Sequence, residues 1–470
     1  MLIFSPARAH VSWKPANSAM SVPPGTHTRS SWFDGVAVYF KPRVLIVLLL
    51  GFSAGLPFSL AGQTLQAWMT ETGVDIRTIG LFAAVGTPYW AKPLWAPAVD
   101  ALDVPLLSRL LGRRRGWLML TQILLVGAII LLAISDPADS PWTVAGAALL
   151  VTTASATQDI VIDAFRVESL PENEQAAGMA SYVAAYRIAV LVSSAGALFL
   201  VSGLMGFGLD KQAAYRATFV AMSGLVLVGI IATLLAREPE KSVAAAAEHS
   251  ARAREGSWKR VTGTAIASFS EFLSRDMAIV VLVFVMLFKF ADTLASALTT
   301  PFVLETGFTR VELATIIKGV GFAAAIAGGF AGGFIARALP MATSLWIGGI
   351  LQAVAIFAFA WQAVVGRDVA WLTFAITAEN FTSGIGTVIF VAYLSALCGN
   401  PLHTATQYAL LTALFALART VLALGSGYIA AATGWMWYFV ICVAASIPSF
   451  ILLFWLQRGG HFATLSARRP

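Results

Sequence analysis

The chain contains twelve stretches of predominantly apolar residues, each of roughly the 20 residues that a helix needs to cross a bilayer. Their expected bounds are 44 to 68, 77 to 99, 116 to 134, 142 to 166, 177 to 204, 215 to 235, 277 to 302, 310 to 336, 341 to 364, 369 to 397, 404 to 432 and 435 to 457. A charged, Ala-rich segment from Arg237 to Asp276 separates the sixth stretch from the seventh. The sequence therefore predicts an all-α membrane protein of twelve transmembrane helices in two groups of six.

Composition agrees with this class and argues against others. Hydrophobic residues make up 58% of the chain and charged residues 12%, whereas soluble domains carry about 25% charged residues. Cys398 and Cys442 lie inside apolar runs and match no metal or redox spacing. The five histidines lie in loops or tails without a paired nucleophile. We therefore expect no enzyme activity, no cofactor and no metal.

Basic residues predict the topology, because Lys and Arg are retained on the cytoplasmic side of a membrane. They concentrate in both tails, in the central segment and in alternate loops, so both termini are expected in the cytoplasm. The net charge of +7 then reflects basic loops, and no nucleic-acid partner is expected. The expected divisions are an N-terminal tail (1–43), a six-helix bundle (44–235), a cytoplasmic central loop (236–276), a second bundle (277–457) and a C-terminal tail (458–470).

The two halves also resemble each other. Glu-Thr-Gly begins at Glu71, after the first predicted helix, and again at Glu305, after the seventh. Arg187 and Arg419 occupy similar places in the fifth and eleventh helices. Repeats of six helices, related by a pseudo-twofold axis, resemble the architecture of major facilitator transporters, whose substrate site lies between the halves.

One apolar run, Thr152 to Leu170 (TTASATQDIVIDAFRVESL), carries Asp159, Asp163 and Arg166. Their spacing of i, i+4 and i+7 places all three on one face of a helix. Ionisable groups at membrane depth cost a few kcal/mol unless they face protein or water, so their default interpretation is functional. The sequence therefore predicts that this helix lines a polar pathway.

Other interior charges fall on helices that line or flank the cavity in this architecture: Lys92, Arg187, Lys289, Asp292, Lys318, Glu379 and Arg419. Gln63 and Gln66 add amides one turn apart. Such groups suit a hydrated solute such as a sugar or peptide. Bases outnumber acids by two if all are ionised, which favours an anionic substrate. Candidates for substrate contact are Gln63, Gln66, Arg187, Lys289 and Arg419. Buried acids take up protons readily, so candidates for proton coupling are Asp159, Asp163, Asp292 and Glu379.

Each assignment has a structural alternative. Lys289 and Asp292 can form a static ion pair, and Asp163 with Arg166 can form a gate that never touches substrate. Lys92 can extend to the membrane surface, and Arg113 to Arg115 can serve only as topological anchors. The glycines of the eighth helix, Gly328, Gly329, Gly332 and Gly333, form a small-residue face that favours close helix packing.

Five motifs together resemble the bacterial muropeptide permeases, the AmpG family of the major facilitator superfamily. They are KPLWAPAVD (from Lys92), GRRRGW (from Gly112), ATQDIVIDAFR (from Ala156), AENFTSGIGT (from Ala378) and ATQYALLTAL (from Ala405). The resemblance runs from about Val44 to Gln457 and implies a monomeric permease of the bacterial inner membrane. Its implied cargo is N-acetylglucosaminyl anhydro-N-acetylmuramyl peptide, imported with protons during cell-wall recycling. In many bacteria this import also feeds β-lactamase induction.

The resemblance also implies roles for single residues. Gln158, Asp159 and Asp163 match the motif of the fourth helix and would bind substrate or couple protons, with Glu379 and Asn380 as counterparts. Asp100, Arg113, Arg114 and Arg166 are expected to act in gating. The chain departs from the family pattern at Phe165, where the family often has Tyr, and in the longer stretch from Ala101 to Leu111. Phe165 leaves the preference for sugar or peptide open.

Two other classes of function stay open. A related facilitator could carry another bulky anion such as acetyl-CoA, and the chain could be a membrane sensor or a membrane-embedded transferase. The central loop is too short for an added signalling domain, and the histidines form no catalytic group. Transport of a muropeptide is therefore the prediction.

Overall fold

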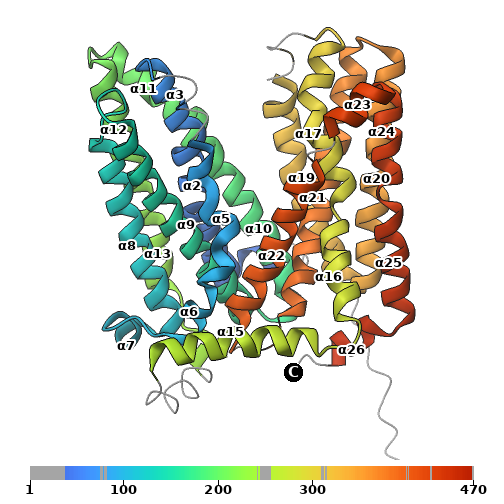
Figure 1. Ribbon diagram of the computed structural model, residues 1–470, viewed down its shortest axis with the longest axis horizontal. Helices are drawn as coiled ribbons and strands as arrows, with labels where there is room; N and C mark the ends of the chain where they lie inside the picture. The colour runs from blue at the N-terminus through green and yellow to red at the C-terminus, as the bar shows by residue number, and fades with distance from the viewer. Residues whose placement is uncertain are drawn as a thin grey trace, which may run out of the picture.

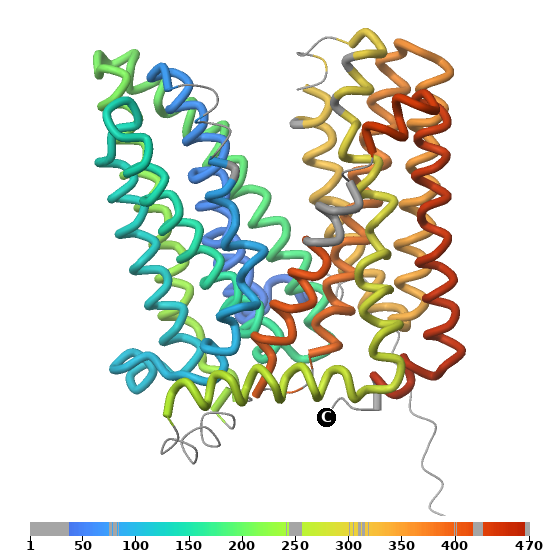
Figure 2. The backbone as a smooth tube through the Cα atoms, in the orientation of Figure 1, coloured from blue at the N-terminus to red at the C-terminus, as the bar shows by residue number. Residues whose placement is uncertain are grey.

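The computed structural model describes residues 37–74, 78, 82–240, 242–243, 256–308, 312, 315–398, 400, 402–423 and 426–467. In these residues the secondary structure is helical throughout. The helices form two bundles that stand side by side, converge at one end and diverge at the other (Figures 1 and 2). A long helix, α15 (Ser257–Leu273), runs across the convergent end, roughly perpendicular to the bundles. This end is called the α15 end below.

The first half contains η1 (Val38–Phe40), α2 (Pro42–Ser59), η2 (Leu60–Thr64), α3 (Leu65–Glu71), η3 (Phe82–Gly86), α5 (Thr87–Ala91), η4 (Lys92–Leu94), α6 (Ala96–Ala101), α7 (Leu107–Leu111), α8 (Arg113–Ile134), α9 (Pro141–Ser169), α10 (Glu172–Leu191), η5 (Val192–Gly196), α11 (Ala197–Gly206), α12 (Lys211–Leu225) and α13 (Leu227–Leu235). The second half contains α16 (Ala278–Leu287), α17 (Phe290–Glu305), η6 (Ile316–Gly321), α19 (Phe322–Ala338), α20 (Met341–Val365), α21 (Val369–Leu397), α22 (Thr404–Ala423), α23 (Ser426–Thr433), α24 (Trp435–Ala444), α25 (Ile447–Arg458) and α26 (His461–Ala467).

Ten helices of the described chain are long and apolar enough to cross a membrane. They match ten of the twelve predicted spans. The other two spans are present as shorter segments: the second consists of η3, α5, η4 and α6, and the eleventh of α22 and α23. Proline explains the breaks in the second span, because Pro88, Pro93 and Pro97 each remove a backbone donor. The predicted all-α membrane fold is confirmed.

The central segment contains a helix that the sequence analysis does not predict. Within the predicted cytoplasmic loop (236–276), residues 257 to 273 form α15. Apolar and polar residues alternate in this segment with a helical period, which the low overall hydropathy conceals. The predicted N-terminal tail falls mostly outside the described residues.

The repeated Glu-Thr-Gly has the same structural role in both halves. Gly73 and Gly307 follow the ends of α3 and α17 with φ of 80° and 93°, a left-handed conformation that glycine adopts without steric cost. The preceding threonines, Thr72 and Thr306, donate to carbonyl oxygens one turn back, at 2.9 and 2.6 Å. The repeat therefore marks the ends of equivalent helices.

Glycine also sets the closest helix packing in the second half, as the sequence predicted. A Cβ atom on Gly328 would clash with the carbonyl oxygen of Phe381, and one on Gly332 would lie 2.7 Å from that of Ile385. A Cβ atom on Gly384 of α21 would likewise clash with the carbonyl oxygen of Ala325. Backbones of α19 and α21 are thus in direct contact, which favours a packing role for these glycines.

Each half has its own apolar core, and the two halves share packing at the α15 end. Val388, Ala405 and Ala409 of the second half belong to a buried cluster made mainly of first-half residues. Val167 of the first half belongs to a second-half cluster in the same way. The halves are therefore joined where they converge.

Candidate functional site

A cavity of about 730 Å³ lies between the halves. Its lining comes from α2, η2, α3, η3, α5 and α9 of the first half and from α22 of the second. The polar members include Ser59, Gln63, Gln66, Tyr89 and Thr152. Amides and hydroxyls alternate here with the aromatic rings of Phe58, Phe82, Trp90 and Phe415. This combination suits a solute with sugar rings and many hydrogen-bonding groups.

A π-helical turn, η2, shapes the wall that carries Gln63. Gly62 has non-helical dihedral angles (φ −104°, ψ −105°), so the helix is distorted within the cavity wall. The hydroxyl of Thr64 donates to the carbonyl oxygen of Ser193, at 2.6 Å, in the π-helical turn η5. Each bulge frees backbone groups from the regular helix pattern, and such bulges are frequent at functional sites. This hydrogen bond therefore joins the two π-helical turns beside the cavity.

A first charged cluster adjoins the cavity through Tyr89, which hydrogen-bonds Ser155 at 3.0 Å. It contains Lys92, Asp159, Asp163 and Arg166. Lys92 is 8% exposed, and its charge acts on both aspartates. It therefore does not extend to the membrane surface, the alternative that the sequence left open. The guanidinium of Arg166 lies 3.8 Å from the carboxylate of Asp163.

A second charged cluster combines residues from both halves. The ammonium of Lys289 is 3.0 Å from the carboxylate of Asp292 and also donates to Ser383 and Gln352. Asp292 and Lys289 are both charged neighbours of Glu379. Arg187, from the first half, has Glu379 and Asp292 as its electrostatic partners. Asn380 donates to Glu379 at 2.9 Å.

Each cluster is electrically balanced, with two bases and two acids. The predicted excess of two positive charges therefore depends on Lys318 and Arg419, whose side chains lie outside the described part of the structure. Several buried polar atoms in the two clusters have no hydrogen-bond partner within the described chain; they include Asp159 Oδ1, Asp292 Oδ1 and Arg166 Nε, and Gln158 Oε1 beside the first cluster is in the same position. Such atoms are costly unless another group satisfies them.

Asp100 joins the two halves at the α15 end. Its carboxylate is fully buried and accepts four hydrogen bonds, one from Arg114 at 2.9 Å. The other three come from α22 in the opposite half: from the Thr406 amide and hydroxyl, each at 2.7 Å, and from the Ala405 amide at 3.3 Å. Asp100 thus caps the N-terminus of a helix in the other half, where a negative charge is favoured. We call this contact the Asp100 latch.

Arg114 and Arg113 support the latch from α8. Arg114 is fully buried and bonds to both oxygens of Glu168, with a shortest distance of 2.6 Å. Arg113 is 3% exposed and donates to the backbone oxygen of Asp100 at 2.9 Å. Both side chains are therefore buried and bonded within the protein, unlike a solvated topological anchor. Sequence reasoning missed Glu168 and Glu238; Glu238 accepts from the amides of Arg114 and Arg115 at the start of α8.

Arg166 makes a second contact across the halves. It donates to Ser395 of α21 at 3.0 Å, and its guanidinium lies 5.3 Å from the centre of the Tyr408 ring on α22. The same side chain therefore belongs to the first charged cluster and to the closure of the α15 end. Arg166 can therefore pair with Asp163 and also act as a gate residue.

Two helical bundles with a shared polar cavity, charged groups beside it and a closed end define a membrane transporter. A family model described as Major Facilitator Superfamily matches residues 47–406. The anhydromuropeptide permease of Escherichia coli (strain K12) is 36% identical over 417 residues, which cover 88% of this chain and 80% of that protein. The chain therefore belongs to the Major Facilitator Superfamily, within the family of anhydromuropeptide permeases.

Solved structures agree on the fold. The proton:xylose symporter XylE, bound to 6-bromo-6-deoxy-D-glucose, has a TM-score of 0.63 at 12% identity and covers 90% of this chain and 96% of its own. The E. coli fucose:proton symporter FucP has a TM-score of 0.63 at 13% identity, with coverage of 88% and 98%. These two likenesses show the fold alone. The family model and the identity to a permease show that the chain is a multi-pass transporter and not an enzyme.

Proposed function

We propose that this protein imports anhydromuropeptides, the disaccharide N-acetylglucosaminyl-1,6-anhydro-N-acetylmuramic acid and its peptide forms, across the bacterial inner membrane with protons. The observation that carries the cargo is the identity of 36% to the E. coli anhydromuropeptide permease over most of both chains. The cavity is compatible with this cargo, because amides, hydroxyls and aromatic rings line it. Peptide carboxylates would approach the basic groups of Arg187 and Lys289.

The mechanism that we propose is alternating access by a monomer. In the orientation predicted from the basic residues, the α15 end faces the cytoplasm, and the structure corresponds to a state closed on that side. Cargo would enter from the periplasm into the cavity beside Gln63 and Gln66. Inward release requires that the Asp100 latch and the contact between Arg166 and Ser395 separate.

Proton coupling is assigned to the acids of the two clusters, Asp159, Asp163, Asp292 and Glu379. Asp292 and Glu379 are close neighbours on different helices of the second half, and two like charges so placed repel each other. A proton on either group removes the repulsion and also changes the attraction for Arg187 in the first half. Proton binding can thereby alter how strongly the halves hold each other.

Uptake into proteoliposomes tests the proposal. Labelled anhydro-disaccharide and its tripeptide form should accumulate when the outside is more acidic, and a protonophore should abolish accumulation. Excess unlabelled cargo should compete, whereas acetyl-CoA should not. Asp163→Asn should lose accumulation, while Asp139→Asn, in an exposed loop at the far end, should retain it. Selective uptake of acetyl-CoA, or accumulation that ignores the proton gradient, would contradict the proposal.

A further inference from the structure

The cavity between the halves is lined by rings, amides and hydroxyls, and none of its lining residues in the described structure is charged. Arg187 and Lys289, the bases assigned to peptide carboxylates, are not among these lining residues. The proposed cargo has two chemically different parts: two sugar rings without charge, and a lactyl or peptide part that carries carboxylates. A carboxylate needs a partner when it leaves water. The sugar rings are therefore the part of the cargo that this cavity suits.

Two aromatic side chains present free ring surface to the cavity. Trp90 on α5 is 57% exposed and Phe58 on α2 is 49% exposed, and both line the cavity. Phe82, which also lines it, is only 5% exposed, because protein covers most of its ring. Removing apolar ring surface from water is favourable. Trp90 and Phe58 are thus the rings that a cargo molecule can cover.

The ring of Phe58 is held in place by other side chains. It packs edge-on against Tyr89, with ring centres 5.7 Å apart, and lies tilted beside Tyr186 at 6.4 Å. Tyr89 is itself fixed by its hydrogen bond to Ser155 at 3.0 Å, and it directly precedes Trp90 on α5. A contact surface that is ordered before the cargo arrives loses little entropy on binding. The described packing therefore favours a binding role for these rings.

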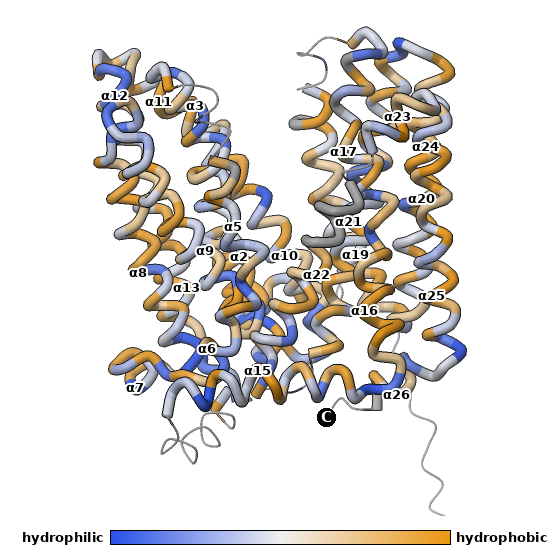
Figure 3. Tube along the Cα trace, in the orientation of Figure 1, coloured by the Kyte–Doolittle hydropathy of each residue, from blue (hydrophilic) through white to orange (hydrophobic). Residues whose placement is uncertain are grey.

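Both halves and two amides complete the surroundings of these rings. Helix α5, which carries Trp90, packs against α22 of the second half (Figure 3), and Phe415 of α22 lines the cavity on that side. Gln63 and Gln66 are exposed on the wall formed by η2 and α3. A glutamine amide both donates and accepts hydrogen bonds, as does an N-acetyl group. The cavity therefore offers rings for the face of a sugar and amides for its N-acetyl group.

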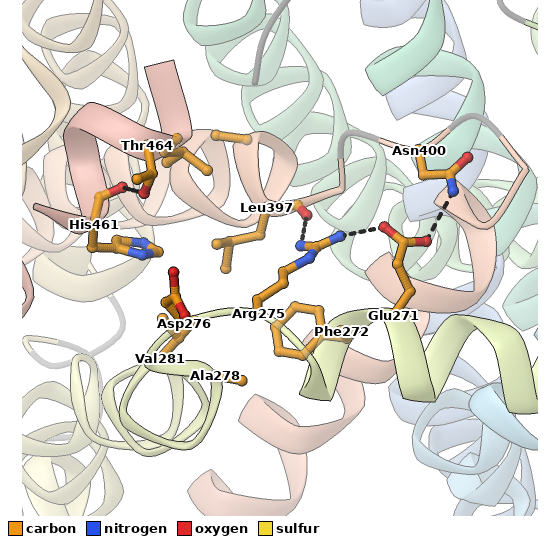
Figure 4. Close-up of a pocket in the computed structure, with 12 residues that line it drawn as sticks. Glu271, Phe272, Arg275, Asp276, Ala278, Val281, Leu397, Asn400, His461 and Thr464 are labelled. Carbon is orange, nitrogen blue, oxygen red and sulfur yellow. Dashed lines mark hydrogen bonds and ion pairs between the residues drawn. The ribbon is translucent and has the colours of Figure 1, made fainter. Parts of the chain in front are cut away.

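A cavity of about 370 Å³ at the α15 end has a different chemical character. Residues of α15, α16, α21 and α26 line it, and Glu271 and Arg275 are among them (Figure 4). Arg275 bonds to Glu271 at 2.9 Å and to the Leu397 carbonyl oxygen at 2.6 Å, and Asn400 donates to Glu271 at 2.8 Å. These groups satisfy one another and attach α15 to the second half. The phenylalanine in this lining, Phe272, is buried, so this cavity offers no comparable ring surface.

The two sugars of the cargo differ in how much flat apolar surface they offer. The N-acetylglucosaminyl ring is a β-pyranose chair with every substituent equatorial, so both of its faces carry axial C–H bonds. Their hydrogens are slightly positive and the face of an aromatic ring is negative, so the two surfaces attract each other. The 1,6-anhydro bridge locks the other sugar in the inverted chair, whose axial substituents cover both faces. The N-acetylglucosaminyl ring is therefore the sugar that can lie flat on an aromatic ring.

We infer that Trp90 and Phe58 form a stacking site for the N-acetylglucosaminyl ring of the cargo. This inference rests on the proposed function, because it takes a muropeptide as the cargo. Phe58 also lies beside Tyr186, and the next residue of α10 is Arg187. The sugar site and the base assigned to the peptide carboxylate therefore lie on two helices, α2 and α10, that pack against each other.

Saturation-transfer NMR on the purified full chain with the disaccharide tests this contact without transport. When the aromatic protons of the protein are saturated, the ring protons of the N-acetylglucosaminyl sugar should receive more saturation than those of the anhydro sugar. Trp90→Ala should remove most of this difference. Trp361→Ala should leave it unchanged, because Trp361 on α20 is similarly exposed (55%) but does not line the cavity. Equal saturation of the two sugars by the unchanged protein would overturn the inference.

Uptake of labelled disaccharide into proteoliposomes gives a second readout. Trp90→Ala and Phe58→Ala should each raise KM about tenfold with little change in the maximal rate. Trp90→Phe should retain most of the affinity, whereas Trp90→Leu, which keeps apolar bulk but no ring, should resemble Trp90→Ala. A KM in Trp90→Ala equal to that of Trp361→Ala would refute the stacking site while leaving the proposed function intact. If the unchanged protein neither bound nor carried the disaccharide, the proposed function itself would fail.

Discussion

Replacing Asp100 by asparagine tests whether the latch keeps the α15 end closed. The carboxylate is fully buried and is the only group that joins Arg114 of one half to the start of α22 in the other within the described hydrogen bonds. Asparagine has nearly the same shape but no charge, and one of its two acceptor atoms becomes a donor. That donor would then face the donors of Thr406 or Arg114.

The free energy that Asp100→Asn removes from the closed state follows from the hydrogen bonds that exist only in that state. Three of the four bonds to Asp100 cross between the halves, and hydrogen bonds to a charged group contribute about 1.5–3 kcal/mol each. Asparagine retains one acceptor oxygen, so we expect a loss of about 3 kcal/mol, including the interaction with the helix N-terminus. This corresponds to a shift of about a hundredfold from the closed towards the open state.

The native Cys398 provides an assay for this shift. It directly follows Leu397 at the end of α21 and is 2% exposed in the closed structure. An impermeant maleimide added to inside-out vesicles should therefore react slowly with the unchanged protein and much faster with Asp100→Asn. Cys442, which is also buried, is replaced by alanine so that one thiol reports.

Two further variants serve as controls for the labelling experiment. Thr406→Val removes only one bond to Asp100 and should increase labelling by a smaller factor. Asp136→Asn breaks a partly exposed ion pair with Arg216, at 3.5 Å, away from the gate, and should leave labelling unchanged. If Asp100→Asn were labelled no faster than Asp136→Asn, the latch would not control opening.

Three further predictions concern cargo contact, packing and pH. Arg187→Ala should raise KM for the peptide-bearing disaccharide by about tenfold and less for the bare disaccharide; equal increases in an uptake assay would argue against carboxylate contact. Gly328→Ala places a Cβ atom against the Phe381 oxygen and should destabilise by about 1–3 kcal/mol, whereas Gly224→Ala, with open space, should not lower the Tm. Burial raises the pKa of Glu271, but hydrogen bonds from Arg275 and Asn400 together lower it by more, so this pKa lies below its ordinary value of 4.5. Its stabilising effect is therefore complete at neutral pH and lost only as pH falls through this lowered pKa, so α15 should stay attached between about pH 5 and 8, as measured by spin-label mobility.

Much of the fold follows from the sequence because bilayer physics leaves few alternatives. Apolar runs of the right length predicted the spans, and the repeated Glu-Thr-Gly marked equivalent helix ends at Gly73 and Gly307. Helix α15 escaped this reasoning, since its sequence contains no apolar run long enough to span a bilayer. The helical spacing of Trp258, Ile266 and Phe269 could have predicted this helix, but a search for long apolar runs does not detect such spacing.

The candidate site was only partly predictable. Charges inside apolar runs identified Asp159, Lys289 and Glu379 as interior groups, because charge in lipid is costly. Their grouping across helices was not predictable, since the position of Arg187 within electrostatic range of Glu379 depends on how the halves dock. The same holds for the Asp100 latch: its partners include backbone amides of α22, and a backbone amide carries no sequence signal.

Protection of the cavity wall by cargo tests the central proposal most directly. Gln63 is an exposed side chain of the cavity wall. Gln63→Cys should therefore react with an impermeant maleimide that is added from the side opposite the α15 end. Saturating anhydro-disaccharide should slow this reaction strongly, while Asp139→Cys, on an exposed loop at the same end, should react at the same rate with and without cargo. Equal labelling of Gln63→Cys with and without bound cargo would mean that the cargo does not occupy the space between the halves.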